Sequence, residues 1–359
     1  MRALFAAGGT GGHIYPALAV AKELVSRHPD AAVRFVGTAR GLETRLVPQA
    51  GFELSLIESA GLMNMGVHQR LRGLWLLPKS FFAARRLLTE FRPDVVVGAG
   101  GYVTGPVLLV AALSRKPTLV MESNAVPGFT NRRLAPFVNA AAVSFEQTRA
   151  YFPAGRAVLT GNPVRREFFD IPVKVRDPAR FSLLLFGGSQ GARAVSDAML
   201  DALAHLAPHR ARLHVTHQTG PLDFARIRDA YAQAGWSDYS DVREYIDDMV
   251  SAFAAADVIV SRAGATTSAE LMAAGRTAIM VPLPGQIEQR RNAEVLQAAG
   301  AARLMLQPNL SGESLAQEIK ALLDDPVEIT RREQAARRLA KPNAAAASVE
   351  LIEKLAARK

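Results

Sequence analysis

The feature that most constrains this chain is a regular alternation of short β-rich runs with helical patterns, which predicts parallel doubly wound α/β sheets. Three glycine-rich turns interrupt it, each where a strand should end and a helix begin: residues 7–13, 98–106 and 187–193. Strands are predicted at 3–6, 33–36, 54–57, 95–97, 118–121, 141–143, 157–159, 182–186, 213–218, 242–244, 258–260, 278–281 and 302–306, with helices including 16–28, 192–206, 249–256, 267–274 and 289–299.

Glycine-rich turns at helix starts are suited to binding phosphate. They expose backbone N–H groups at the positive end of the helix dipole, and the missing Cβ lets a ligand approach. One such turn is a weak signal. Three of them, divided between the two halves of the chain, indicate an enzyme that handles at least one diphosphate.

Length and charge narrow the class further. A chain of 359 residues suits two domains, and the break is expected near 161–178, where prolines gather. The net charge of +10 falls entirely within residues 1–165, which carry 19 Lys and Arg against 9 Asp and Glu. A basic first half indicates an anionic partner: nucleic acid, a membrane surface or a phosphate-bearing substrate. The alternative is an uneven but solvated surface.

Targeting and redox signals are few. The absence of cysteine excludes disulfides, thiolate metal sites and a cysteine nucleophile, and fits a reducing compartment. The sequence shows no signal-peptide pattern at residue 1. The uncharged stretch 95–114 has glycines and a proline in its middle, which favours a strand, a loop and a buried helix over a membrane span.

The first turn does not match the dinucleotide-binding fingerprint. Its spacing is wrong, and the second strand ends in Gly37-Thr38 where an acidic ribose ligand is expected. His13 ends this turn. It is either a general base facing a diphosphate-bearing substrate or a helix-start residue that only makes a hydrogen bond, and the spacing favours neither.

The later turns also point to phosphate. Residues 187–191 match the nucleophile elbow of hydrolases, but that fold needs a histidine far downstream and the chain has none after His217. Ser189 is therefore better interpreted as a hydrogen-bond donor to a phosphate. The segment 261–270 follows a strand and carries hydroxyls that suit a phosphate. Glu270 either binds both hydroxyls of a ribose or is an ordinary surface glutamate.

Residues 70–86 mix bulky apolar and basic side chains, which is typical of an interfacial membrane contact. The alternative is a helix with its apolar face in the core. The predicted membrane patch comprises Leu74, Trp75, Leu77, Lys79, Phe81, Phe82, Arg85 and Arg86. No nucleic-acid recognition motif, Walker A sequence or metal-ligand spacing is present, so we expect no nucleic acid, no metal and no cofactor.

Seven segments together resemble the MurG family of bacterial peptidoglycan glycosyltransferases along nearly the whole chain. They are residues 8–19, 100–106, 124–128, 161–165, 187–192, 246–249 and 261–270. In this order they are specific, although no single one is. Two segments depart from the family pattern: Glu288 stands where a neutral side chain or an imidazole is usual, in a shortened loop, and Ser123 replaces the common glutamine.

The resemblance implies an α/β protein of two Rossmann-like domains with parallel sheets facing across a cleft, the GT-B fold. It implies an N-terminal acceptor- and membrane-binding domain (1–163), a C-terminal UDP-GlcNAc-binding domain (164–340) and a final helix (341–359) that packs back on the first domain. The implied reaction is inverting, metal-independent transfer of N-acetylglucosamine from UDP-GlcNAc to the muramyl C4 hydroxyl of undecaprenyl-linked lipid I, giving lipid II.

The resemblance also implies the site. His13 is the candidate base. The donor UDP-GlcNAc is assigned to Thr10, Gly11, Gly12, Asn124, Arg165, Ser189, Ile246, Ala265, Thr266, Thr267, Ser268, Ala269, Glu270 and Gln289. The acceptor diphosphate is assigned to Gly9, Gly100, Gly101, Tyr102 and Thr104. The implied partners are UDP-GlcNAc, lipid I, the anionic cytoplasmic face of the inner membrane, where the protein would be peripheral, and cell-wall and division proteins.

Two other functions compete with this one. An epimerase or hydrolase of UDP-GlcNAc on the same scaffold would turn over soluble substrate and need no membrane patch. A non-catalytic nucleotide-sugar-binding scaffold would tolerate loss of His13.

Overall fold

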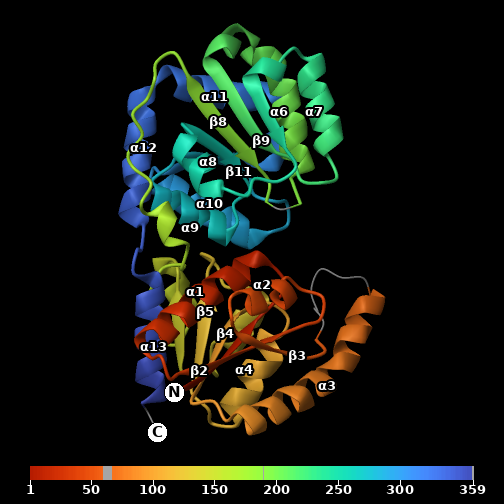
Figure 1. The fold of residues 1–359 in the computed structure, drawn as a ribbon, viewed down its shortest axis with the longest axis vertical. Helices are drawn as coiled ribbons and strands as arrows, with labels where there is room; N and C mark the ends of the chain where they lie inside the picture. The colour runs from red at the N-terminus through yellow and green to blue at the C-terminus, as the bar shows by residue number, and fades with distance from the viewer. Residues whose placement is uncertain (60–66, 189, 358–359) are drawn as a thin grey trace. The chain divides into compact units, whose positions relative to one another are not determined.

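The computed structural model describes residues 1–59, 67–188 and 190–357, with the side chains of 67–77 outside that description. The chain divides into two compact units (Figure 1). Unit 1 comprises Met1–Val164 and Lys341–Lys359, and unit 2 comprises Arg165–Ala340.

Unit 1 is built on a seven-stranded parallel sheet with strand order β3-β2-β1-β4-β5-β6-β7. Its strands are β1 (Arg2–Ala7), β2 (Ala32–Gly37), β3 (Glu53–Leu56), β4 (Val95–Gly100), β5 (Thr118–Glu122), β6 (Ala140–Val143) and β7 (Ala157–Leu159). Its helices are α1 (Gly11–Arg27), α2 (Glu43–Gln49), α3 (Val67–Phe91), α4 (Thr104–Leu113), α5 (Phe129–Leu134), the 3₁₀ helix η1 (Glu146–Tyr151) and α13 (Ala344–Ala356).

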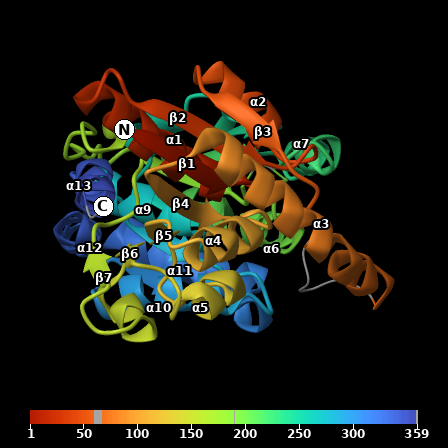
Figure 2. The same cartoon turned by 90° about the horizontal axis from the view of Figure 1, so that it is seen from below.

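Helices cover both faces of this sheet, as a parallel sheet requires. One face packs against α1 and α13 through a buried cluster that includes Ile14, Leu24, Val349 and Ile352. The other face packs against α3 and α4 (Figure 2). Burying each of the large side chains of α13 stabilises unit 1 by about 1.5–3 kcal/mol, so the last helix of the chain is integral to its first unit.

Unit 2 repeats the design with a six-stranded parallel sheet of order β10-β9-β8-β11-β12-β13. Its strands are β8 (Phe181–Phe186), β9 (Leu213–Gln218), β10 (Ser240–Arg243), β11 (Val258–Ser261), β12 (Ala278–Met280) and β13 (Ala302–Leu304). Its helices are η2 (Arg166–Phe168), α6 (Arg193–Leu206), η3 (Ala207–Arg212), α7 (Phe224–Gln233), η4 (Ser237–Tyr239), α8 (Met249–Ala255), α9 (Ala265–Ala274), α10 (Ile287–Ala298), η5 (Gln307–Asn309), α11 (Gly312–Asp324) and α12 (Pro326–Leu339).

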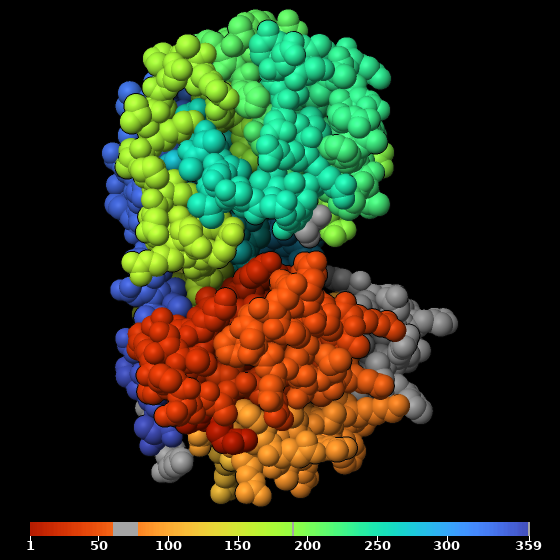
Figure 3. Space-filling model, viewed as in Figure 1, coloured from red at the N-terminus to blue at the C-terminus, as the bar shows by residue number. Residues whose placement is uncertain are grey.

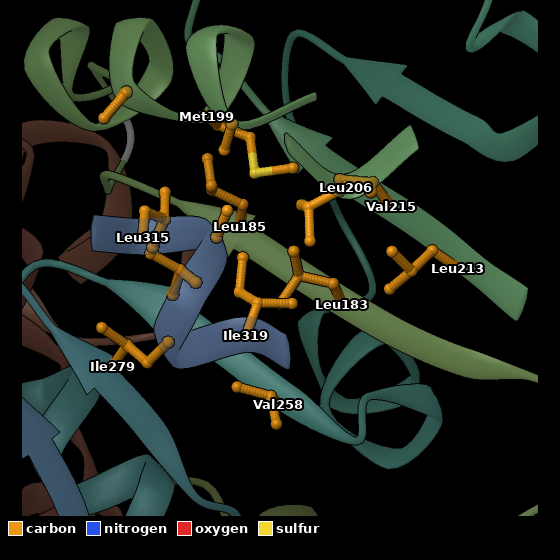
Figure 4. Close-up of a cluster of buried hydrophobic side chains, with 14 of the residues drawn as sticks. Leu183, Leu185, Met199, Leu206, Leu213, Val215, Val258, Ile279, Leu315 and Ile319 are labelled. Carbon is orange, nitrogen blue, oxygen red and sulfur yellow. The ribbon is translucent and has the colours of Figure 1, made fainter. Parts of the chain in front are cut away.

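The core of unit 2 lies where α6 and α11 cover the sheet. Leu183 and Leu185 of β8 meet Met199 of α6 and Leu315 and Ile319 of α11 in one buried cluster (Figure 4). The apolar positions of each helix recur at helical spacing, so one stripe faces the sheet and the opposite side faces solvent.

The strand order creates one topological switch point in each unit. In unit 1, β1 lies beside β4, and the chain leaves these strands toward helices on opposite faces; in unit 2, β8 and β11 have the same relationship. Ligands of open parallel sheets bind at the carboxyl ends of such strand pairs. The first two glycine-rich turns follow β1 and β4, the third follows β8, and the segment 261–270 spans the end of β11.

The predicted two-sheet parallel α/β fold is confirmed, with a strand at each predicted position. The helix predicted at 16–28 was wrong at its start, because α1 begins at Gly11. Pro16 lies inside that helix, beyond its first turn, where it has no N–H to donate to the Gly12 carbonyl.

Candidate functional site

The first two glycine-rich turns meet at the switch point of unit 1. A Cβ on Gly100 would collide with the imidazole of His13, and one on Gly101 would collide with the backbone of Gly8. Both positions also have positive φ, 114° and 82°. Glycine is therefore required here for conformation and for space. The Thr104 hydroxyl fixes the second turn by accepting a hydrogen bond from Gly100 N–H at 3.0 Å.

His13 occupies the first turn of α1 and is half-buried. Its Nδ1 lies 3.2 Å from the carbonyl oxygen of Gly8. A carbonyl only accepts, so Nδ1 carries the proton and Nε2 holds the lone pair in the neutral ring. Burial lowers the pKa of His13, while the Gly8 hydrogen bond and the charge of Glu43 act in the opposite direction. A neutral imidazole with an unprotonated Nε2 is the state a general base requires.

Two buried carboxylates organise the loops of unit 1, and sequence reasoning missed both roles. Glu43 accepts a hydrogen bond from Gly9 N–H at 2.9 Å. Glu122, at the end of β5, accepts from Asn124 and Gly128 backbone N–H groups at 2.9 and 3.1 Å and from Asn131 Nδ2 at 2.8 Å. Burial raises the pKa of Glu122. The loop that carries Asn124 is thus fixed by a carboxylate beneath it.

The third glycine-rich turn is tied to its neighbours by Gln218 at the end of β9. This buried side chain donates to the Gly188 carbonyl at 3.0 Å and accepts from Ile246 N–H at 2.9 Å. Gly188 of the predicted 187–192 segment and Ile246 are therefore joined through one side chain. Ser189, the predicted hydrogen-bond donor to a phosphate, lies outside the described residues.

The N-terminus of α9 is the second feature of the unit 2 switch point. Gly264 caps this helix without a side-chain hydrogen bond, so the first-turn amides, those of 265–267, have no intrahelical acceptor. Thr266 Oγ1 and Ser261 Oγ are buried hydroxyls without a hydrogen-bond partner in the described structure. Buried polar atoms left unsatisfied are uncommon and call for an explanation. Here an anionic ligand at the helix start would satisfy them.

Three other residues that were predicted to bind UDP-GlcNAc lie in unit 2. Glu270 is in α9, and burial raises its pKa to about 7, although the positive charge of Arg165 opposes the shift. The guanidinium of Arg165 lies over the Phe168 ring, 5.0 Å from its centroid. Gln289, in the first turn of α10, accepts from Leu283 N–H at 3.0 Å and so braces the preceding loop.

The predicted membrane patch falls on α3. Leu74, Trp75 and Leu77 belong to this helix, but their side chains lie outside the described part of the chain. Lys79, Arg85 and Arg86 are exposed, and Phe82 is 74% exposed. Phe81 instead packs partly against the core of unit 1.

Figure 3 shows the described surface of the first strands and helices of unit 1 in red and orange. Within residues 1–59, 67–188 and 190–357, no helix is both long and apolar enough to cross a bilayer. The same residues contain no group of three or more His, Asp or Glu side chains placed to hold a metal ion.

Two Rossmann-like units, each with a glycine-rich turn at the switch point of a parallel sheet, define the GT-B class of fold. Comparison with protein-family models identifies the family. The N-terminal domain of glycosyltransferase family 28 matches residues 3–143, and the C-terminal domain of that family matches residues 182–350. This chain belongs to glycosyltransferase family 28.

Curated relatives match along the same length. Two curated relatives are similar to this chain, one from Anaeromyxobacter sp. (strain Fw109-5) and one from Myxococcus xanthus (strain DK1622). Both are named UDP-N-acetylglucosamine–N-acetylmuramyl-(pentapeptide) pyrophosphoryl-undecaprenol N-acetylglucosamine transferase. The first is 47% identical and covers 96% of this chain and 91% of the relative. The second is 43% identical and covers 96% and 90%.

Solved structures agree with this family. The crystal structure of Acinetobacter baumannii MurG superposes with a TM-score of 0.81 at 33% identity, covering 98% of this chain and 99% of that one. The UDP-GlcNAc 2-epimerase of Neisseria meningitidis superposes with a TM-score of 0.71 at 16% identity, covering 99% and 100%. At that identity the epimerase shows a shared fold alone.

Proposed function

We propose that this glycosyltransferase moves N-acetylglucosamine from UDP-GlcNAc to the C4 hydroxyl of the muramyl sugar in undecaprenyl-pyrophosphoryl-MurNAc-pentapeptide, giving lipid II for peptidoglycan synthesis. The observation that carries the proposal is the full-length match, at 42–47% identity, to proteins named for this reaction. The glycine-rich turns at both switch points supply the diphosphate sites that the reaction needs.

Unit 2 would hold the donor. The amides at the start of α9 and the unsatisfied hydroxyl of Thr266 suit its diphosphate, with Arg165 and Ser189 as further predicted contacts. Ala265 to Ala269 would line the nucleotide. Glu270 would accept the ribose hydroxyls.

Uracil recognition is assigned to Ile246. The Ile246 N–H already donates a hydrogen bond to Gln218. A hydrogen bond between this residue and uracil would therefore use the Ile246 carbonyl as acceptor. Gln289 and, from unit 1, Thr10, Gly11, Gly12 and Asn124 stay predicted contacts of the donor.

Unit 1 would hold the acceptor diphosphate on Gly9, Gly100, Gly101, Tyr102 and Thr104. The muramyl O4 attacks the anomeric carbon from the face opposite UDP, and the bond from that carbon to the phosphate oxygen breaks. His13 Nε2 takes the proton from O4. The negative charge that develops on UDP is stabilised by fixed amides and Arg165, without a metal ion. One displacement inverts the anomeric centre.

The protein would act as a peripheral enzyme on the cytoplasmic face of the inner membrane. Exposed Phe82 beside Arg85 and Arg86 supports this placement, because a bulky apolar group among basic ones suits an anionic bilayer surface. Lipid I is then presented in the plane on which the patch rests. Cell-wall and division proteins stay predicted partners.

The test is transfer of radiolabelled GlcNAc from UDP-GlcNAc to a short-chain lipid I analogue in the presence of EDTA. The expected product is a labelled disaccharide-lipid formed only when acceptor is present. Release of UDP without labelled lipid, or formation of an epimerised UDP-sugar, would overturn the proposal in favour of a hydrolase or an epimerase. No turnover at all would favour a binding protein.

A further inference from the structure

Glu43, the first residue of α2, is a fully buried carboxylate in unit 1. Its Oε2 accepts from Gly9 N–H at 2.9 Å, and its Oε1 accepts from Thr38 N–H at 2.8 Å and Thr38 Oγ1 at 3.0 Å. Both oxygens therefore accept from N–H donors. The carboxylate joins the turn after β1 to the loop after β2.

The surrounding backbone makes room for this one side chain. A Cβ added to Gly8, Gly37 or Gly41 would collide with the Glu43 side chain. Three glycines from two loops thus line a chamber that an acidic side chain fills. A hydrophobic residue there would leave the partly buried Gly9 and Thr38 amides without this acceptor, at up to about 1–3 kcal/mol each.

Two hydrogen bonds and the peptide group between them connect this chamber to His13. Glu43 fixes the N–H of Gly9, and the carbonyl of the preceding residue, Gly8, accepts the hydrogen bond from His13 Nδ1. Glu43 thereby holds the peptide that sets the tautomer and the orientation of the imidazole. We infer that Glu43 is a positioning residue for the reaction, holding the His13 ring through the Gly8–Gly9 peptide and supplying a negative charge that favours protonation of Nε2.

This role rests on the proposed function, in which His13 takes the acceptor proton. A half-buried imidazole with no countercharge is a weak base, because burial disfavours its cationic form. Among the described residues, Glu43 on α2 is the ionisable group whose charge acts on His13 to raise its pKa. A stronger base takes the hydroxyl proton more readily.

The experiment compares Glu43→Gln, Thr38→Val and the unaltered enzyme. Glutamine keeps the shape but removes the charge, and its NH₂ must face one of the N–H donors. Thr38→Val removes the hydrogen bond from the Thr38 hydroxyl to Glu43 and keeps the negative charge of Glu43. Each protein is followed by the pH dependence of kcat/KM and by NMR titration of the His13 imidazole, assigned by its disappearance in His13→Gln.

For Glu43→Gln we expect kcat to fall about 10- to 100-fold, as misplacement of a catalytic group does. We also expect the acid limb of kcat/KM and the His13 titration to move together to lower pH. A loop that is merely loosened would hydrate the imidazole and move its titration to higher pH. The two explanations therefore predict opposite signs. Thr38→Val should leave the titration unchanged.

An unchanged or upward shift of the His13 titration in Glu43→Gln would overturn the inference, whatever the activity. The proposed role of His13 is judged separately by the rate of His13→Gln. If the transfer rate of that variant falls by less than about 10-fold, His13 is not the general base, while the NMR result on Glu43 still stands.

Discussion

Replacing Glu270 with glutamine is expected to weaken donor binding and to remove its pH dependence. Burial raises the pKa of Glu270 to about 7 in the unliganded protein, with the charge of Arg165 acting against the shift. If the ionised carboxylate accepts both ribose hydroxyls, binding must first drive off the proton wherever the pH lies below about 7. The affinity for UDP-GlcNAc then falls as the pH is lowered.

The magnitude follows from the fraction of ionised Glu270. With a pKa of about 7, about one chain in ten is ionised at pH 6 and about nine in ten at pH 8, so the dissociation constant should be roughly 10-fold larger at pH 6. A hydrogen bond to a charged group contributes about 1.5–3 kcal/mol, so Glu270→Gln should bind about 10- to 100-fold more weakly at pH 8. Its affinity should be the same at both pH values.

Isothermal titration calorimetry with UDP-GlcNAc provides the assay. Both phosphates of this ligand are esterified on either side, so it lacks the terminal phosphate ionisation, near a pKa of about 6, that would confuse a titration with UDP. The 2′-deoxy donor is the matched control: it keeps one of the two hydroxyls, so it should bind the unaltered protein more weakly and lose less affinity on Glu270→Gln than UDP-GlcNAc does. Equal affinity of the unaltered protein at pH 6 and pH 8 would refute the reasoning.

The free energy of unfolding should depend on pH in the opposite sense to donor affinity. The folded state keeps the Glu270 proton to about pH 7, while the unfolded chain releases it near 4.5, so stability is lost as the pH rises between these values. At about 1.4 kcal/mol per tenfold change this corresponds to roughly 3 kcal/mol, and partial exposure of the side chain reduces our expectation to about 2 kcal/mol. Glu270→Gln should therefore unfold at a higher temperature than the unaltered, ligand-free protein at pH 8.

Four further predictions concern other parts of the chain. His13→Gln should lower kcat by about 10²–10⁴-fold in single-turnover transfer assays, with little change in donor affinity measured by calorimetry. Burial lowers the pKa of His217 to about 3, so the unfolded chain binds its proton first. Between pH 6.5 and 4.5 this costs unit 2 about 2–3 kcal/mol, and the cost is measured by urea unfolding as the difference in pH dependence between the unaltered protein and His217→Gln. Gly101→Ala should destabilise unit 1 by more than Gly51→Ala in thermal melts, since both have positive φ but only the first Cβ meets backbone. Phe82→Ser should weaken flotation with anionic vesicles about 10-fold or more and leave the melting temperature unchanged, because 74% of Phe82 is exposed.

Local patterns were enough to predict the fold. Each strand is a short apolar run bounded by turn residues, and the glycine-rich turns mark where strands give way to helices, so the two parallel sheets could be read from residues near in sequence. The start of α1 was misplaced because glycine disfavours helices, yet Gly11 and Gly12 occupy a first turn whose N–H groups need no intrahelical partner, and the helix continues through Pro16.

Residues that act through distant partners could not be found this way. Glu43 lies 34 positions from Gly9, and Gln218 lies 30 positions from the Gly188 carbonyl that it contacts. In the sequence both look like ordinary polar residues at the edge of an element. Their burial follows from strand order, which places the ends of β1 and β2, or of β8 and β9, side by side.

The most direct test of the account is the linkage made by the purified enzyme in EDTA, determined by proton NMR of the product from UDP-GlcNAc and the lipid I analogue. A single displacement at the α-linked donor predicts a β-linked N-acetylglucosamine on the muramyl C4 oxygen, with the large anomeric coupling of that configuration. An α-linked product, linkage to another hydroxyl, or free N-acetylglucosamine would contradict direct inverting transfer.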